Sequence, residues 1–238
     1  NHERYPQLTR LLEEGFSLTM QLVHWIMQLA PFGILALLMK LVATENSDLL
    51  VSLAAFVAVV TGTTLVHGLV VLPLIALIFG KVSPLRFLQG ARPALLTAFA
   101  TSSSSATIPV TMNCLEQDFK VSPQITGFVV PMGAQLNMDG TALYEAAAAL
   151  FVANLVGMHL DVGQQLIVCF TAMLASIGAP GIPSAGMVTM VMVLQSVGLP
   201  AEAIAILLPI DRILDTVRTA VNVEGDIVAS LVVHRHAT

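Results

Sequence analysis

The sequence predicts an all-α integral membrane protein with broken helices, and three observations support this fold class. Hydrophobic residues make up 56% of the 238 residues, charged residues only 11%, and the mean hydropathy of +0.85 is far above that of a soluble domain of this size. Three apolar stretches exceed the roughly 20 residues that cross a bilayer as a helix. Two further apolar stretches are interrupted near their middle by small and polar residues.

The three long stretches, residues 16–43, 50–79 and 125–156, are the candidates for membrane-spanning helices. Pro31 should kink the first of them. Basic residues follow the second, beginning at Lys81, and indicate its cytoplasmic end, because positive charge gathers on that side of a membrane. The polar lead before the first stretch suggests a loop or an interfacial helix, and a chain that is a fragment lacking earlier helices.

The two interrupted stretches predict re-entrant helical hairpins. In residues 87–115 the apolar sequence is broken by TSSSSAT, and in residues 165–199 it is broken by GAPGIPSAG. Each arm is too short to cross a bilayer alone. Non-helical backbone at membrane depth needs protein or a water-filled cavity to satisfy its polar groups, so the two tips should face a site. Two such segments in corresponding halves are typical of secondary transporters that bind their substrate near the midplane.

The segment DRILDTVRTAVNVEGD concentrates charge in this apolar chain. At about 100° per residue its polar side chains share one helix face; they are Asp211, Asp215, Arg218, Thr219, Asn222 and Asp226. Ionisable groups are costly in a bilayer and usually mark a substrate or ion path. Because arginine fits a carboxylate and aspartate can hold an ammonium group, the face predicts a site for a zwitterion with an extra negative charge. The alternative is a structural pair in which Asp215 and Arg218 neutralise each other.

The third long stretch contains NMDGT in mid-span, which indicates that the helix unwinds locally and frees backbone carbonyls for a cation. Asn137 and Asp139 add side-chain oxygens, the ligands that hard cations such as sodium prefer. The alternative for Asp139 is a buried helix N-cap. Glu145 is an isolated carboxyl in an apolar helix, and because a bilayer disfavours its charged form it is a candidate proton carrier.

Other classes of function are not supported. The net charge of −5 is too small to suggest nucleic-acid binding, and the absence of a nucleophile elbow, a zinc motif or a phosphate loop argues against an enzyme and against an organic cofactor. We expect Cys114 and Cys169 to be packing residues. His24, His67 and His159 have no paired partners in the sequence, so we expect satisfied polar groups. Among five methionines of the central segments, only Met138 is not assigned to packing.

Four motifs resemble the dicarboxylate/amino acid:cation symporter family, which includes the bacterial and archaeal glutamate transporters and the mammalian excitatory amino acid transporters. They are TSSSSATIPVTM, GAQLNMDGTALYE, ASIGAPGIPSAG and RTAVNVEGD. The resemblance covers essentially the whole chain but only the second part of the family's eight-helix fold. It implies the glutamate-transporter fold, a multi-pass protein in a bacterial inner (plasma) membrane, and a homotrimer when the chain is complete. The implied partners are an amino acid substrate, sodium ions and the lipid bilayer.

By this resemblance, residues 1–43 match the fifth membrane helix, which belongs to the trimeric scaffold, and residues 44–238 match the moving transport domain. The first four helices have no counterpart. The implied elements of the transport domain are the sixth helix, hairpin one at about 84–118, the seventh helix at about 124–156, hairpin two at about 163–199 and the eighth helix at about 203–234.

The resemblance also implies the residues that bind substrate. The α-carboxylate would be held by hairpin one, by the backbone of hairpin two from Ile182 to Gly186, and by Asn222. Asp215 would bind the α-amino group, while Arg218 and Thr141 would take the side-chain carboxylate. The whole implied set is Ser103, Ser104, Thr141, Ile182, Gly186, Asp215, Arg218, Thr219 and Asn222.

Three sodium sites are implied as well. The first combines a carboxylate with backbone carbonyls: Asp226 with Gly133, Asn137 and Asn222. The second consists of backbone oxygens of Gln135, Ser176, Ile177 and Ala179. The third consists of Asp139 and the Asn137 side chain, with its other ligands on a missing helix. Glu145 matches the position that carries the coupled proton in mammalian members.

Two positions depart from the family. Ser102 stands where archaeal members have an arginine, and Thr216 stands where mammalian members have a compensating one, so either Arg212 takes over that role or no residue does. The expected function is symport of glutamate or aspartate with sodium, protons or both, by an elevator motion. The alternatives are a C4-dicarboxylate or neutral amino acid symporter of the same fold, and a fragment that does not transport.

Overall fold

The computed structural model describes residues 6–44 and 47–237, and all regular structure in these two ranges is helical, which confirms the all-α class. The chain divides into two compact units, residues 1–45 and residues 46–238. We describe each unit by itself.

The described residues of the first unit form one helix, α1 (Pro6–Thr44), of 39 residues. The polar lead that suggested a loop or an interfacial helix is helical from Pro6, and residues 1–5 lie outside the described ranges. The helix continues through Pro31, and its apolar part is the shorter segment Gln28–Thr44. Large apolar side chains such as Phe32 are exposed, so this helix presents a surface suited to lipid or to other helices.

The second unit begins with a long helical stretch, Ser47–Ile78. It consists of α2 (Ser47–Val66), a π-helical turn η1 (His67–Val71) and α3 (Leu72–Ile78). Among the residues that the structure describes, this is the one helix long and apolar enough to cross a membrane by length and composition. The long helix predicted at residues 50–79 is therefore present, whereas the other two long stretches do not meet this criterion.

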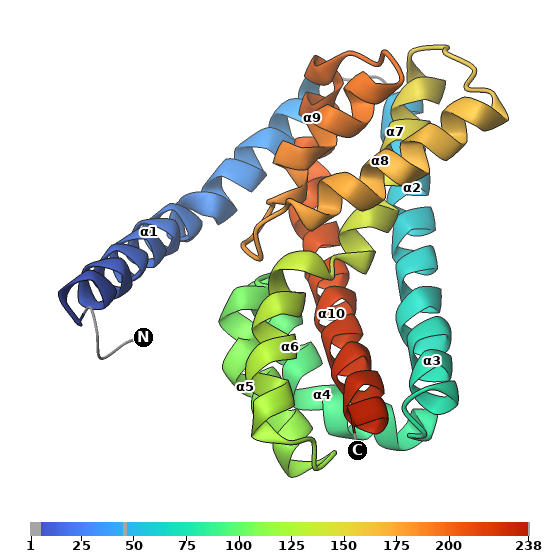
Figure 1. Ribbon diagram of the computed structural model, residues 1–238. Coiled ribbons are helices and arrows are strands. Elements are labelled where there is room, and N and C mark those ends of the chain that lie inside the picture. Colours follow the sequence, from blue (N-terminus) through green and yellow to red (C-terminus); the bar gives the residue numbers. More distant parts are fainter. Residues whose placement is uncertain (1–5, 45–46, 238) are drawn as a thin grey trace. The chain divides into compact units, whose positions relative to one another are not determined.

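The two interrupted stretches form two pairs of packed helices (Figure 1). The first pair is α4 (Pro84–Thr101) and α5 (Ser104–Gln117), and the second is α8 (Val162–Ile177) and α9 (Gly186–Ser196). We call these pairs hairpin one and hairpin two, and their tips are residues 102–103 and 178–185. In the first tip, Ser102 adopts a left-handed conformation with φ of 50°, and the Oγ of Ser103 accepts the Ala106 N–H at 3.1 Å. This cap starts α5 immediately after α4 ends.

The third long stretch is broken where NMDGT predicted it. Helix α6 (Pro123–Leu136) and helix α7 (Asp139–Leu155) are separated by the non-helical residues Asn137 and Met138. The alternative in which Asp139 is the N-cap is wrong, because Met138 occupies the N-cap and Asp139 is the first residue of α7. The Oδ2 of Asp139 instead lies 3.3 Å from the Nε2 of His67.

The last helix, α10 (Ile204–Ala237), follows a short 3-10 turn η2 (Ala201–Ala203) and lies at the centre of the second unit (Figure 1). It packs against α2, α3, α4, α5, α6, α7 and α9. Three alanines of α4 that are fully buried, Ala91, Ala94 and Ala98, allow the backbones of the neighbouring helices to approach closely. Glu224 is 3% exposed and lies against Gly68 of the π-helical turn.

Close backbone contact between α7 and α10 should make Gly140 sensitive to any side chain. A Cβ at this position would lie 2.6 Å from the carbonyl oxygen of Arg218, which is main chain and cannot move cheaply. We expect Gly140→Ala to destabilise the protein by about 1–3 kcal/mol through overpacking. Gly62→Ala in α2 is the control, because a Cβ there meets nothing within 4 Å and should raise stability through helix propensity. Thermal unfolding in detergent measures both, and equal melting temperatures would contradict the predicted packing.

Candidate functional site

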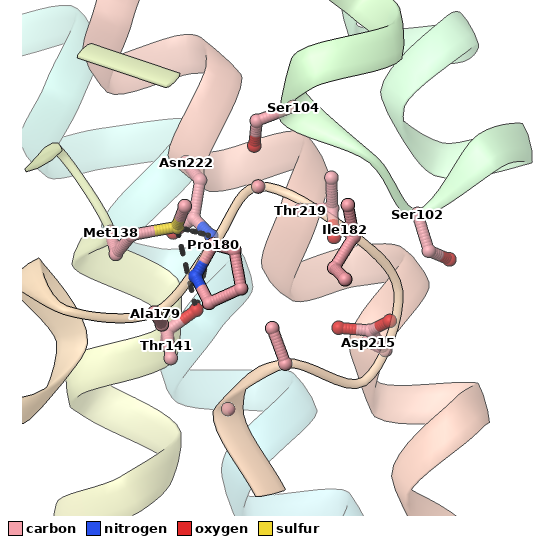
Figure 2. Close-up of a pocket in the computed structure, with 13 residues that line it drawn as sticks. Ser102, Ser104, Met138, Thr141, Ala179, Pro180, Ile182, Asp215, Thr219 and Asn222 are labelled. Carbon is pink, nitrogen blue, oxygen red and sulfur yellow. Dashed lines mark hydrogen bonds between the residues drawn. The ribbon is translucent and has the colours of Figure 1, made fainter. Parts of the chain in front are cut away.

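The tips of both hairpins and the break between α6 and α7 meet beside the middle of α10 and enclose a small cavity (Figure 2). Its volume is about 10 Å³, enough for about one water molecule. Ser104 comes from hairpin one, Ile182 from the tip of hairpin two, Thr141 from the start of α7, and Asp215 and Asn222 from α10. Four segments distant in sequence therefore contribute to one closed site.

The charges of this site gather around Arg218, which is 1% exposed. Its Nη1 donates to Oδ1 of Asp211 at 3.1 Å, and its Nη2 donates to Oδ1 of Asp215 at 2.5 Å. Arg212 approaches the other oxygen of Asp215 with its Nη1 at 3.4 Å. Two arginines and two aspartates thus balance in charge, so the structural pairing of Asp215 with Arg218 is present in this closed arrangement.

An aromatic ring completes the surroundings of this guanidinium. The Cζ of Arg218 lies 4.2 Å from the centroid of the Tyr144 ring, a cation–π arrangement. The Tyr144 hydroxyl approaches the sulfur of Met187 at 3.4 Å. The Nε of Arg218 is buried and has no hydrogen-bond partner among the residues described. The arginine is therefore oriented from two sides while one of its donors stays unused.

Asp215 also connects α10 to hairpin two. Its Oδ2 accepts the backbone N–H of Ser184 at 2.9 Å. Ser184 adopts a left-handed conformation with φ of 57°, uncommon for a residue with a side chain. A hydrogen bond to a buried carboxylate offsets that strain, so the charge on Asp215 helps to hold the tip in place.

Asn222 connects α10 to the break in the third stretch. Its Oδ1 accepts the Gly140 N–H at 2.7 Å, and its Nδ2 donates to Oγ1 of Thr141 at 3.1 Å. The same Nδ2 lies 3.3 Å from the sulfur of Met138. One amide group thus satisfies a backbone donor in the first turn of α7 that the helix break leaves without an intrahelical partner.

Residues of the first predicted sodium site lie close together next to Asn222. The Nδ2 of Asn137 donates to the carbonyl oxygen of Asn222 at 3.2 Å and to Oδ1 of Asp226 at 3.0 Å. Asp226 is 1% exposed, and a Cβ at Gly133 would collide with its Oδ1. A carbonyl and a carboxylate therefore converge on one partially positive NH₂ group, and oxygens so arranged are suited to a cation as well.

The other two predicted sodium sets are less closely assembled. The second set lies at the ends of α6 and α8, which pack against each other, and its members are Gln135, Ser176, Ile177 and Ala179. The carbonyl of Ser176 accepts the Ala179 N–H at 3.1 Å. In the third set Asp139 contacts His67 whereas the Asn137 amide contacts Asp226, so no hydrogen bond joins these two side chains.

Glu145 lies deeper in α7, fully buried. Its Oε1 accepts a short hydrogen bond from the hydroxyl of Thr189 in α9, and its Oε2 has no partner in the described part of the chain. A Cβ at Gly186 would lie 3.8 Å from Oε1 of Glu145 and 3.9 Å from Cζ of Arg218. The predicted proton carrier is therefore next to hairpin two and close to the charge centre.

Seven of the nine predicted substrate-binding residues line the cavity; they are Ser104, Thr141, Ile182, Gly186, Asp215, Thr219 and Asn222. Ser103 instead caps α5 and donates its hydroxyl to the Gly181 carbonyl at 2.8 Å, and Arg218 lies behind Asp215. The prediction missed Pro180 and Gly181, and it did not assign Ser102 or Met138 to the site. The GAPGIPSAG tip contained the first two, because a turn of small residues brings its backbone close to whatever it covers.

Hairpin tips that meet at a broken helix beside a buried charged helix are typical of a secondary transporter. The chain matches the sodium:dicarboxylate symporter family over residues 1–236 and belongs to that family. Excitatory amino acid transporter 3 of Mus musculus is 49% identical over 209 residues, 87% of this chain and 40% of the relative. An excitatory amino acid transporter of Caenorhabditis elegans is 44% identical over 220 residues, 92% of this chain and 44% of the relative.

Excitatory amino acid transporter 1 of Bos taurus is 47% identical over 209 residues, 87% of this chain and 39% of the relative. The chain therefore spans less than half the length of each of these three relatives. The resemblance inferred from the four motifs is confirmed, and the family consists of transporters rather than enzymes. Because these relatives are eukaryotic, a bacterial inner membrane stays a prediction.

The Asp211–Arg218 ion pair and the Arg212–Asp215 ion pair should differ in their contribution to stability. Asp211→Asn leaves the fully buried Arg218 with one carboxylate, and breaking a buried pair costs about 3–5 kcal/mol. Arg212→Gln removes a longer contact of a partly exposed side chain, which contributes about 1 kcal/mol or less. Thermal unfolding of the two variants should show the much larger decrease for Asp211→Asn. A larger decrease for Arg212→Gln would contradict this ranking.

Proposed function

We propose that the protein is a symporter that couples inward movement of sodium, protons or both to the uptake of glutamate or aspartate. The observation that carries this proposal is Asp215 in the lining of the cavity, paired with the buried Arg218 next to it. Arginine offers a planar fork for a carboxylate, and aspartate offers a negative partner for an ammonium group. An acidic amino acid presents both groups in one molecule.

Binding in this proposal is an exchange of ion pairs. Asp215 now shares its charge with Arg218, Arg212 and the Ser184 N–H. A substrate ammonium group takes over Asp215, and the substrate side-chain carboxylate takes over the released guanidinium of Arg218. The ammonium group and the side-chain carboxylate of the substrate each gain a charged partner, which matters because an uncompensated charge at membrane depth is costly. Thr141 and Asn222 line the cavity and supply polar hydrogens for the carboxylates of the substrate.

The cavity of about 10 Å³ is too small for an amino acid, so binding requires the two hairpin tips to separate. The bond from Ser184 to Asp215 supports hairpin two as the part that opens, because substrate binding at Asp215 competes with it. In this proposal residues 44–238 are the moving transport domain of an elevator, both hairpins are re-entrant, and residues 1–43 belong to the scaffold of a homotrimer. The protein then resides in the plasma membrane as a multi-pass protein.

Sodium is a co-transported substrate in this mechanism. The oxygens of Asn222 and Asp226 that now accept the Asn137 amide support the first site, which also includes the Gly133 carbonyl. The two other sites follow from the family resemblance alone, and Glu145 is the proposed proton carrier. Its unpartnered Oε2 and its contact with hairpin two support that role, because movement of the hairpin then changes what surrounds the carboxyl.

Asp215 and Arg218 together distinguish an acidic amino acid from the two alternative substrates, a C4-dicarboxylate and a neutral amino acid. A C4-dicarboxylate has no ammonium group for Asp215, and a neutral amino acid has no second carboxylate for Arg218. The pairing of Asp215, which lines the cavity, with Arg218 therefore favours an acidic amino acid.

The proposal predicts that Arg218→Ala abolishes uptake of radiolabelled L-aspartate into proteoliposomes of the full chain under an inward sodium gradient. Losing a buried charge partner of a carboxylate costs about 3–5 kcal/mol, which corresponds to a fall of at least roughly 100-fold in kcat/KM. Arg92→Gln, an exposed residue of α4, is the matched control and should transport like the unchanged protein. Undiminished aspartate uptake by Arg218→Ala would overturn the assignment of an acidic amino acid.

The cation assignments predict opposite effects for two isosteric variants. Asp226→Asn removes the carboxylate of the first sodium site, so half-maximal uptake should need at least about tenfold more sodium, while uptake driven by a proton gradient is retained. Glu145→Gln should keep sodium-driven uptake and lose the part driven by protons alone. Uptake by each variant under each gradient measures this, and loss of the same component in both variants would contradict separate sites.

A further inference from the structure

Gln135, in the last turn of α6, extends its side chain between the tips of the two hairpins. Its Nε2 donates to Oγ of Ser105 in hairpin one at 2.9 Å. Its Oε1 accepts the backbone N–H of Gly181 in hairpin two at 3.4 Å. Since only the oxygen of the amide can accept from a backbone N–H, these two contacts fix the orientation of the amide group.

The two tips also contact each other directly at Gly181. Its carbonyl oxygen accepts the Ser103 hydroxyl at 2.8 Å and the Ser105 N–H at 3.1 Å. A Cβ at this position would lie 2.6 Å from the Ala134 carbonyl oxygen and 2.7 Å from Oγ of Ser105. The tips touch because residue 181 is a glycine, and both polar groups of its peptide are occupied by hairpin one and α6.

We propose that Gln135 is a positioning residue that holds the two tips together over the cavity and thereby slows the release of substrate. Gly181 lines the cavity, so the tips cannot separate there without breaking its contacts. The contacts on its carbonyl come from hairpin one, whereas Gln135 belongs to neither hairpin and ties both to α6. The effect on substrate rests on the proposed function, but the effect on the two tips does not.

Glutamine suits this task for chemical reasons. It carries one donor for the Ser105 hydroxyl and one acceptor for the Gly181 N–H at the end of a long side chain. The Gln135 side chain is exposed, and hydrogen bonds in contact with solvent are individually weak and easily exchanged. A contact that must break and re-form in every cycle needs that property, which a buried ion pair would lack.

Distance measurements on the tips test the proposal without any ligand. Spin labels on Phe99 of α4 and Val188 of α9, both exposed, report the separation of the two hairpins in the full chain in liposomes; Cys169→Ser removes the exposed native thiol. Gln135→Met, which has similar length but cannot form these bonds, should increase the population with longer distances. Gln135→Glu should restore the short distance, because the Ser105 hydroxyl can donate to it. An unchanged distribution in Gln135→Met would overturn the proposal.

A double-mutant cycle tests the effect on substrate. Gln135→Met and Ser105→Ala should each raise the Kd for L-aspartate and its dissociation rate roughly 5- to 10-fold, because each removes about one net hydrogen bond. The double variant should be no weaker than either single variant. Ser196→Ala, whose hydroxyl bonds only within α9, is the control and should add independently to Gln135→Met. A positioning role would be contradicted if the changes in Kd of Gln135→Met and Ser105→Ala were additive in the double variant. It would also be contradicted if each variant lowered the melting temperature enough for lost stability to account for the weaker binding.

The two proposals can fail separately. If the unchanged protein binds no aspartate, the proposed substrate is wrong, while the spin-label distances still decide whether Gln135 holds the tips. If aspartate binds normally and the distances do not respond to Gln135, the positioning role alone is wrong.

Discussion

The burial of one guanidinium organises the centre of this protein. Arg218 is almost inaccessible, so it needs carboxylates within reach, and Asp215 and Asp211 lie one and two turns before it, respectively, on the same helix. That spacing forces a continuous polar face onto α10, which can only be buried if the neighbouring helices present polar groups of their own. The tips of both hairpins and the break of the third stretch provide those groups, which is why they converge at this height of α10.

Interrupted helices and the charged helix therefore depend on each other. A break in a helix leaves backbone N–H and C=O groups without intrahelical partners, and such groups are costly in an apolar environment. In this protein the side chains of α10 take several of them: Asn222 accepts from Gly140, and Asp215 accepts from Ser184. Either feature alone would be destabilising at membrane depth. Together they form a site whose polar groups already have partners that a substrate can replace.

Much of this arrangement follows from local sequence signals. The break at Asn137 and Met138, the two helix pairs and the shared face of α10 were all predictable, because each depends on small residues, turn residues or helical periodicity within one segment. Contacts between segments that are distant in sequence could not be predicted from these local signals. The approach of His67 to Asp139 joins residues 72 positions apart, and that of Thr189 to Glu145 joins residues 44 apart. The alternative that made Asp139 the N-cap failed by one residue, the usual margin for a helix boundary.

The π-helical turn in the first long helix of the second unit has a further consequence for how that helix meets α10. A π turn contains one residue more than an α-helical turn, so every residue after it is rotated by about 100° relative to an uninterrupted helix. The rotation brings Leu72, Pro73 and Ala76 to the buried side. Gly68, within the turn, leaves the space that the Glu224 side chain fills. One inserted residue thus keeps the buried residues of two consecutive halves on the same side of a single helix, where both halves pack against α10.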